Sequence, residues 1–281
     1  MVVLSVAACD TVEPQPDPAP SSIQPIPRVD FATGLDVART LAALPDGRVL
    51  VWDAVSRLSV FSAAGEREDF ATGVSAKDTA VFPDGRLLVA DRGRGLIWML
   101  SITGEKSIFV NRNGTLEPTA MDNPTGVAIL PDGRVLVAEY RRDRISVVSP
   151  SGVRSDFATG LLSPYDLEVL PDGGVLVIED PQDGQSRISV LTASGERSDF
   201  AAGLGVFGFY SQMAVLPDGR VLVAEPSLDR VSVLSATGER SDFATGLERP
   251  QGLAVLPDGR VLVTEQGPSR GQGRISVIGD D

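Results

Sequence analysis

One pattern of hydrophobic and polar residues recurs at six places in the chain. An apolar stretch such as LAVL at 253–256 is followed by Pro-Asp-Gly and by a second apolar stretch such as VLV at 261–263. Proline fixes φ at one corner of a turn and glycine accepts a positive φ, so Pro-Asp-Gly predicts a tight turn between two strands. The six turns begin at Pro45, Pro83, Pro131, Pro171, Pro217 and Pro257.

The repeats follow one another at intervals of 38, 48, 40, 46 and 40 residues. Each continues with a third apolar stretch, such as RISVVS at 144–149, and a polar one, such as RSDFATG at 154–160. A period near 40 residues with four strands predicts an all-β, six-bladed propeller over residues 28–281. The last repeat lacks its fourth strand, and residues 28–34 match that strand. We therefore expect the N-terminal strand to complete the last blade and close the ring.

The first 27 residues do not follow the repeat. Residues 1–9, MVVLSVAAC, resemble a bacterial lipoprotein signal that ends at a lipidated cysteine, Cys9, although the usual basic segment is missing. Residues 10–27 contain six prolines and no basic residue, which is typical of an extended tether. The alternative is a short apolar start with an unmodified Cys9. We expect a protein held in the bacterial cell envelope by a lipid anchor alone, on the periplasmic or extracellular side.

Composition removes several kinds of chemistry. The chain has no histidine and one cysteine, so it cannot form a Ser-His-Asp triad, a histidine-ligated zinc site or a cysteine cluster. Its net charge of −13 argues against a nucleic-acid surface, which needs a basic stripe. We expect neither a metal nor a cofactor.

An acidic residue ends the second strand of every repeat, and an arginine precedes the third strand in five of the six. A ring of acids suits a cation, whereas an acid paired with an arginine in each blade is a structural device. We favour the structural interpretation, because a charge that repeats together with its partner usually supports the fold. The acids are Asp53, Asp91, Glu139, Glu179, Glu225 and Glu265, and the arginines are Arg57, Arg144, Arg187, Arg230 and Arg274, with Arg94 near the equivalent place in the second repeat.

The irregular segments of the repeats fall on one predicted face of the propeller. This face is formed by the loops between second and third strands and by the connections to the next blade. All three tyrosines lie there, and we interpret them with neighbouring residues as a ligand-binding mouth for a sugar ring, an anionic molecule, a glycan or a protein. The alternative is that these rings only pack beneath the loops. The predicted site comprises Tyr140, Arg141, Arg142, Tyr165, Phe207, Phe209 and Tyr210.

Segments such as PQGLAVLPDGRVLVTE and NPTGVAILPDGRVLVAE resemble NHL repeats and the six-bladed propellers of the SMP-30/gluconolactonase group. The resemblance covers residues 28–281 and implies the fold, while such propellers include both enzymes and binding modules. In SMP-30-like lactonases, Glu, Asn and Asp side chains hold a metal. None of the matching positions here is a carboxylate, and two are cationic. These positions are Arg39, Lys77, Thr125, Tyr165, Ser211 and Gln251.

Two functions therefore stand as hypotheses. The first is a non-catalytic binding or scaffolding propeller that uses the variable face near blades three to five. The alternative is an SMP-30-like hydrolase or lactonase with a rearranged site. Asp78 and Asp166 would do its acid–base chemistry, together with Asp122 or Asn123, although Asp78 is as well placed for a simple ion pair with Lys77.

Overall fold

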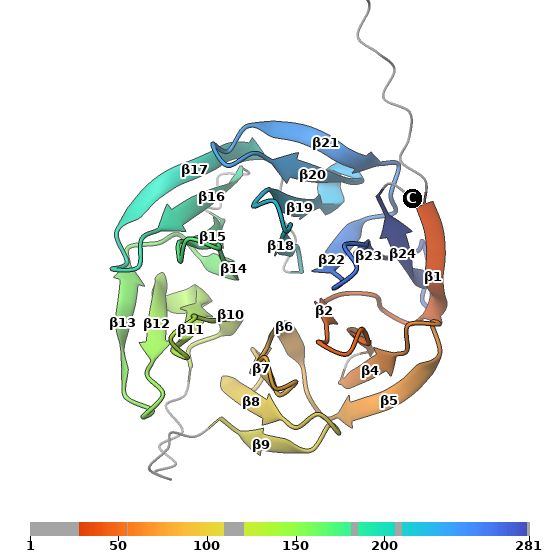
Figure 1. The fold of residues 1–281 in the computed structure, drawn as a ribbon, viewed down its shortest axis with the longest axis horizontal. Coiled ribbons are helices and arrows are strands. Elements are labelled where there is room, and N and C mark those ends of the chain that lie inside the picture. The colour runs from red at the N-terminus through yellow and green to blue at the C-terminus, as the bar shows by residue number, and fades with distance from the viewer. Residues whose placement is uncertain (1–27, 55, 110–120, 181–184, 206–209, 280–281) are drawn as a thin grey trace, which may run out of the picture.

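Six four-stranded antiparallel sheets surround a central axis in the computed structural model, which describes residues 28–54, 56–109, 121–180, 185–205 and 210–279 (Figure 1). This confirms the predicted six-bladed propeller. In each blade the first strand lies nearest the axis and the fourth forms the rim. Blades one to three contain β2 (Leu41–Ala43), β3 (Val49–Ala54), β4 (Arg57–Phe61), β5 (Arg67–Thr72); β6 (Ala76–Val81), β7 (Leu87–Asp91), β8 (Leu96–Leu100), β9 (Lys106–Ile108); β10 (Pro124–Ile129), β11 (Val135–Glu139), β12 (Arg144–Val148) and β13 (Arg154–Thr159).

The other three blades have the same arrangement of four strands, except that the fourth strand of the sixth blade comes from the start of the chain. Its rim strand is β1 (Arg28–Leu35), which pairs antiparallel with β24 (Gly273–Ile278), as predicted. Arg28 also forms an ion pair with Glu265 at 3.1 Å. The remaining strands are β14 (Pro164–Val169), β15 (Val175–Glu179), β16 (Ser186–Leu191), β17 (Arg197–Leu204), β18 (Met213–Val215), β19 (Val221–Glu225), β20 (Arg230–Leu234), β21 (Arg240–Thr245), β22 (Pro250–Val255) and β23 (Val261–Glu265).

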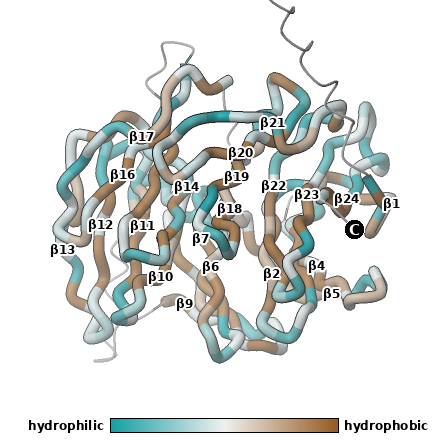
Figure 2. Tube along the Cα trace, turned by 45° about the horizontal axis from the view of Figure 1, so that its top comes forward, coloured by the Kyte–Doolittle hydropathy of each residue, from teal (hydrophilic) through white to brown (hydrophobic). Residues whose placement is uncertain are grey.

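The hydrophobic core is divided into six clusters, and each cluster lies between two neighbouring blades. Alternate residues of one strand serve different clusters: Leu50 and Trp52 face blade two, whereas Val49 and Val51 face blade six. This explains why the second strands are apolar on both faces. Figure 2 shows hydrophobic residues along the strands and hydrophilic residues at many of the turns.

The repeated acid of each blade is paired with arginine, which confirms the structural interpretation. In blade three, Glu139 has no exposed surface and accepts hydrogen bonds from the side chains of Arg144, Arg154 and Ser146. Five of the six blades repeat this acid–arginine–serine arrangement. In blade two, Asp91 instead accepts hydrogen bonds from Arg94 and from Nε1 of Trp98.

Helical structure within the described part of the chain is limited to two 3-10 turns, η1 (Tyr140–Arg142) and η2 (Pro226–Leu228). Neither is long enough to cross a membrane.

Candidate functional site

The residues that begin the innermost strands form the mouth of the channel on the predicted variable face. The strand pairing is irregular at this point in four blades, between Ala76 and Asp78 in β6 and at the equivalent places in β10, β14 and β22. Such bulges re-aim side chains, and they are frequent beside functional sites. Here the bulges place successive residues of a strand in two layers. In β6, for example, Lys77 lies at the mouth and Asp78 lies beneath it.

Two cations and two aromatic rings meet on one side of the mouth. The guanidinium carbon of Arg39 lies 3.9 Å from the ring centre of Tyr210 and 5.0 Å from that of Trp52. Lys77 Nζ lies 3.4 Å from the Tyr210 ring centre. The Trp52 and Tyr210 rings are 5.4 Å apart. We call these four residues the cationic corner.

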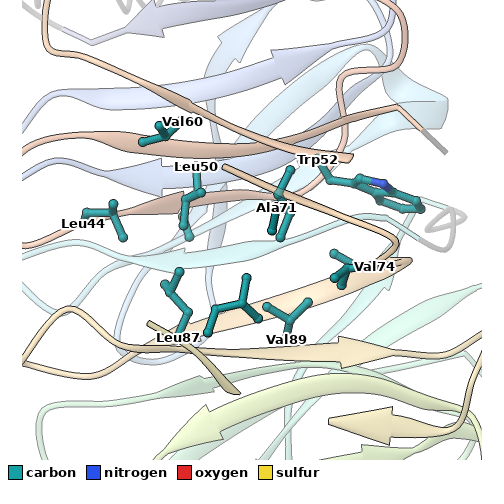
Figure 3. Close-up of a cluster of buried hydrophobic side chains, with 12 residues drawn as sticks. Leu44, Leu50, Trp52, Val60, Ala71, Val74, Leu87 and Val89 are labelled. Carbon is teal, nitrogen blue, oxygen red and sulfur yellow. The ribbon is translucent and has the colours of Figure 1, made fainter. Parts of the chain in front are cut away.

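Local pairing in blade one places Arg39 beside Trp52. The Arg39 amide donates to the Trp52 carbonyl at 3.3 Å, and the Trp52 amide donates to the Thr40 carbonyl at 3.1 Å. Trp52 also packs in the core between blades one and two, at one end of the cluster drawn in Figure 3. The indole therefore connects the rigid core to the mouth, which gives the cationic corner a fixed wall.

Burial perturbs the ionisation of both cations. Burial, together with the positive charges of Arg39 and Arg92, lowers the pKa of Lys77 to about 7. Burial also lowers the pKa of Arg39. A mouth that concentrates positive charge in a chain of net charge −13 is suited to an anion.

Of the buried hydrogen-bonding groups that have no partner among the described residues, two lie in the cationic corner and a third belongs to the residue that follows Tyr210 in the chain. They are Nε of Arg39, Nε1 of Trp52 and Oγ of Ser211. Trp52 is 3 % exposed and Ser211 is 5 % exposed. A buried donor without an acceptor costs about 1–3 kcal/mol, so a ligand oxygen that accepts from these groups would relieve a penalty already present in the fold.

The other two tyrosines lie together on the side formed by blades three and four. The rings of Tyr140 and Tyr165 are 5.2 Å apart, and the Tyr165 hydroxyl donates to Asp180 at 3.2 Å. Tyr165 is only 6 % exposed and packs in the core between blades four and five. Arg92 lies over Tyr140 and donates to Asn123 at 3.0 Å. The structure thus divides the predicted aromatic wall into two pairs, and Tyr210 pairs with Trp52.

The remaining residues of the predicted mouth are placed less centrally. Arg141 and Arg142 are exposed on η1, and Arg142 forms an ion pair with Asp122 at 3.2 Å. Phe207 and Phe209 lie outside the described residues, as does Cys9 with the whole of 1–27. A binding role for Tyr140, Tyr165, Arg141 and Arg142 stays a prediction.

Asp78 and Asp166 lie in the layer beneath the mouth and hold neighbouring blades together. Asp78 accepts from the Val127 amide of blade three at 2.7 Å, and Asp166 accepts from the Met213 amide of blade five at 2.7 Å. The hypothetical ion pair between Asp78 and Lys77 is not formed, because Asp78 is buried while Lys77 stacks on Tyr210. The carboxyl groups of Asp78 and Asp166 therefore accept hydrogen bonds from backbone amides, which limits both residues as catalytic groups.

Gln212 connects blades that are not neighbours. Its side-chain amide donates to Asp78 at 3.1 Å, and its side-chain oxygen accepts from the Leu41 amide of blade one at 2.9 Å. The intervening blade has Gly252 at this level, where a Cβ would lie 2.0 Å from the Arg39 carbonyl oxygen. The Asp78–Gln212 link thus forms part of the floor of the mouth.

The inner strands enclose a cavity of about 320 Å³, which is lined by Asp78, Gln212 and residues of each inner strand. Five of the inner strands turn an alanine into it at the same level, and blade four turns Glu168 into it. Burial, with the nearby charge of Asp78, raises the pKa of Glu168 to about 8. Burial likewise raises the pKa of Asp78 to about 6 and that of Asp166 well above its ordinary value. The alanines are Ala42, Ala80, Ala128, Ala214 and Ala254.

No family model and no curated protein matches the sequence. Solved structures do match the fold. A gluconolactonase from Xanthomonas campestris is 15% identical, with 95% of this chain and 99% of that one covered at a TM-score of 0.75. A calcium-binding regucalcin from Agrobacterium tumefaciens is 16% identical (91% and 96%, TM-score 0.69), and virginiamycin B lyase from Staphylococcus aureus is 15% identical (89% and 87%, TM-score 0.60).

These solved structures share the fold of this chain. They are six-bladed propellers of the gluconolactonase-like kind, as the sequence resemblance implied. The metal of SMP-30-like lactonases does not fit the mouth of this chain, because Arg39 and Lys77 occupy two of the positions that would need to supply oxygen ligands. No group of three His, Cys, Asp or Glu residues suited to a metal occurs within the described ranges.

Four residues of the site were not among the predicted site residues. Trp52 was not named in the prediction, although it lies at the mouth end of β3 beside Arg39. Arg39 and Lys77 were treated as evidence against a metal, and Lys77 also as a possible partner of Asp78. Aligning the six repeats would have found Glu168, because this residue of LEVL replaces the alanine found at the same position in the other five repeats.

Proposed function

We propose that this protein binds a small anionic ligand at the mouth of the propeller, with the acidic group of the ligand held at the cationic corner. The observation that carries the proposal is a set of buried polar atoms that have no hydrogen-bond partner among the described residues, Arg39 Nε, Trp52 Nε1 and Ser211 Oγ, beside the amine of Lys77. A carboxylate or phosphate accepts several such hydrogen bonds at once.

The proposed setting is the bacterial cell envelope, with residues 10–27 as a tether and Cys9 as the lipidated residue. This part of the proposal rests on the sequence pattern alone. A binding propeller at the end of a tether would capture small molecules on the outer side of a membrane.

Tryptophan fluorescence provides a direct test, because the chain contains only two tryptophans. Trp98→Phe leaves Trp52 as the single reporter at the mouth. Gluconate, which carries a carboxylate, should change its emission with saturation, whereas glucose at equal concentration should not. Arg39→Gln should weaken the gluconate response by about tenfold or more, the effect of losing a charge-assisted hydrogen bond. Equal responses to gluconate and glucose would contradict the proposal.

Lactone hydrolysis is the second candidate function, favoured by the likeness to gluconolactonases. Without the family's metal, Lys77 is better placed than Asp78 or Asp166 to activate water, because it lies at the mouth and its pKa is about 7. Hydrolysis of glucono-δ-lactone in the presence of EDTA tests this function. Loss of the rate in Lys77→Met but not in Asp166→Asn would support it, and a rate equal to the uncatalysed one would exclude it for this substrate.

A further inference from the structure

Lysine is rare in this protein, and its placement is informative. Of 25 basic residues, only Lys77 and Lys106 are lysines. Arginine supplies the partner of every repeated acid, as well as the cations of the Pro-Asp-Gly turns. A guanidinium stays protonated in proteins, whereas an amine can lose its proton and act as a nucleophile. The amine at the mouth is therefore chemically different from the rest of the chain's positive charge.

The surroundings of Lys77 favour its neutral form. Its side chain is half-buried on the face of Tyr210, and the Arg39 guanidinium lies on the same ring. Arg92 adds another positive charge from blade two. Like charges and burial both favour loss of the amine proton, and a desolvated lysine beside another cation is a recognised form of activated nucleophile. Among the described residues, Arg39 and Arg92 lower the pKa of Lys77 by their charge, and the titratable side chain of Tyr210 lies against the amine.

The position of Arg39 determines which kind of ligand would lie beside the Lys77 amine. Its Nε has no acceptor among the described residues, and it faces the same ring as the amine. Because the Arg39 guanidinium carbon and Lys77 Nζ both lie within 4 Å of the Tyr210 ring centre, a ligand whose carboxylate binds Arg39 would hold its other atoms within a few ångström of Lys77. If one of those atoms is a carbonyl carbon, the amine is placed to attack it.

We propose that Lys77 forms an imine with small oxo acids, which are molecules that carry a carbonyl group close to a carboxylate. This proposal rests on the anion recognition proposed above. The neutral Nζ attacks the carbonyl carbon, and the carbonyl oxygen takes a proton to give a carbinolamine. Loss of water then leaves a carbon–nitrogen double bond, so one water is released for each imine formed and no oxidant or reductant is consumed.

The two lysines give a matched comparison within one molecule. Lys106 begins the exposed rim strand β9, where its amine donates to the Thr72 carbonyl at 2.7 Å. At pH 7.5 an ordinary lysine, with a pKa near 10.4, has about 0.1% of its amine unprotonated. An amine with a pKa of about 7 is mostly unprotonated at that pH.

The experiment treats the full chain with pyruvate and cyanoborohydride, which reduces the imine to a stable amine, and locates the adduct by peptide mass spectrometry. We expect at least about tenfold more adduct at Lys77 than at Lys106, with a rate that rises through pH 7. Lys106→Arg should leave labelling at Lys77 unchanged, and Lys77→Arg should abolish the mouth adduct. Arg39→Gln should lower labelling by pyruvate more than labelling by propanal, which lacks the carboxylate.

Lactate separates failure of the imine from failure of anion binding, because it keeps the carboxylate and lacks the carbonyl. If lactate and pyruvate both change Trp52 emission but Lys77 is labelled no more than Lys106, the imine proposal is overturned and anion binding stands. If lactate has no effect and propanal labels Lys77 as strongly as pyruvate does, anion recognition is overturned and the oxo-acid assignment with it.

Discussion

Replacing Glu168 with alanine should stabilise the protein in alkaline solution and have little effect in acid. The substitution restores the alanine that the other five blades turn into the channel at this level. Because burial and the charge of Asp78 raise the pKa of Glu168, the folded state favours the neutral carboxyl. The stability associated with its protonation is fully present below pH 4.5, and it is lost as the pH rises through about 8.

The magnitude follows from the two ends of this range. A pKa displaced from 4.5 to about 8 corresponds to at most about 5 kcal/mol of unfolding free energy between pH 4.5 and pH 8. The cavity beside Glu168 admits water, so the ionised carboxylate keeps part of its hydration. We therefore expect Glu168→Ala to raise the unfolding free energy at pH 9 by about 1–3 kcal/mol.

Thermal melting of the wild type and the variant from pH 4.5 to pH 9 measures the difference. For a domain of this size, about 1 kcal/mol moves Tm by about 2–4 °C, so the two Tm values should separate by about 2–10 °C at pH 9 and nearly coincide at pH 4.5. Glu168→Gln, which keeps the size of the side chain, should follow the same curve. A difference in Tm that is constant with pH, or a lower Tm for the variant at pH 9, would refute the reasoning.

Three further predictions concern other parts of the chain. Deleting residues 1–35 removes β1 and the Arg28–Glu265 ion pair, so the truncated chain should melt at a lower temperature and over a broader range than the full chain; an unchanged calorimetric melt would contradict ring closure. Tyr165→Ala should lower the unfolding free energy by about 2–4 kcal/mol in urea titrations, because the ring is 6 % exposed, and a loss below about 1 kcal/mol would instead favour a free binding surface. Cys9→Ser, expressed behind an intact signal, should move the protein from the membrane to the soluble fraction, and retention in the membrane would exclude lipid anchoring.

The fold was predictable because every blade has the same sequence pattern. Pro-Asp-Gly marks the same turn six times, and the acid–arginine pairs close each blade locally, as between Glu139 and Arg144 five positions along the chain. Ring closure followed from counting strands, since the last repeat lacks its fourth strand and residues 28–34 supply it. The paired acids and arginines lie within one repeat, and residues 28–34 match the sequence of the missing fourth strand.

The mouth was less predictable because its contacts join distant blades. Arg39 stacks on Tyr210 although 171 positions separate the two residues. The Leu41 amide, equally far along the chain from its partner, donates a hydrogen bond to the Gln212 side chain across the channel. No periodic pattern identifies such pairs. The sequence placed Tyr210 at the mouth, but its ring partner there is Trp52, which was not among the predicted site residues.

The most informative positions in this chain are those where one blade departs from the other five. Repetition makes the departures visible: a carboxyl group replaces a methyl at Glu168, and an amine stands at the mouth in a chain that otherwise uses arginine almost throughout. Neither change is needed to form a blade, since the other blades form without it. Glu168 leaves an ionisable group in a buried channel, where it lowers stability above neutral pH, and Lys77 holds an amine beside Arg39 at the expense of charge repulsion. Strain of this kind, confined to one axis and one face of an otherwise regular propeller, is what a functional channel and mouth would produce.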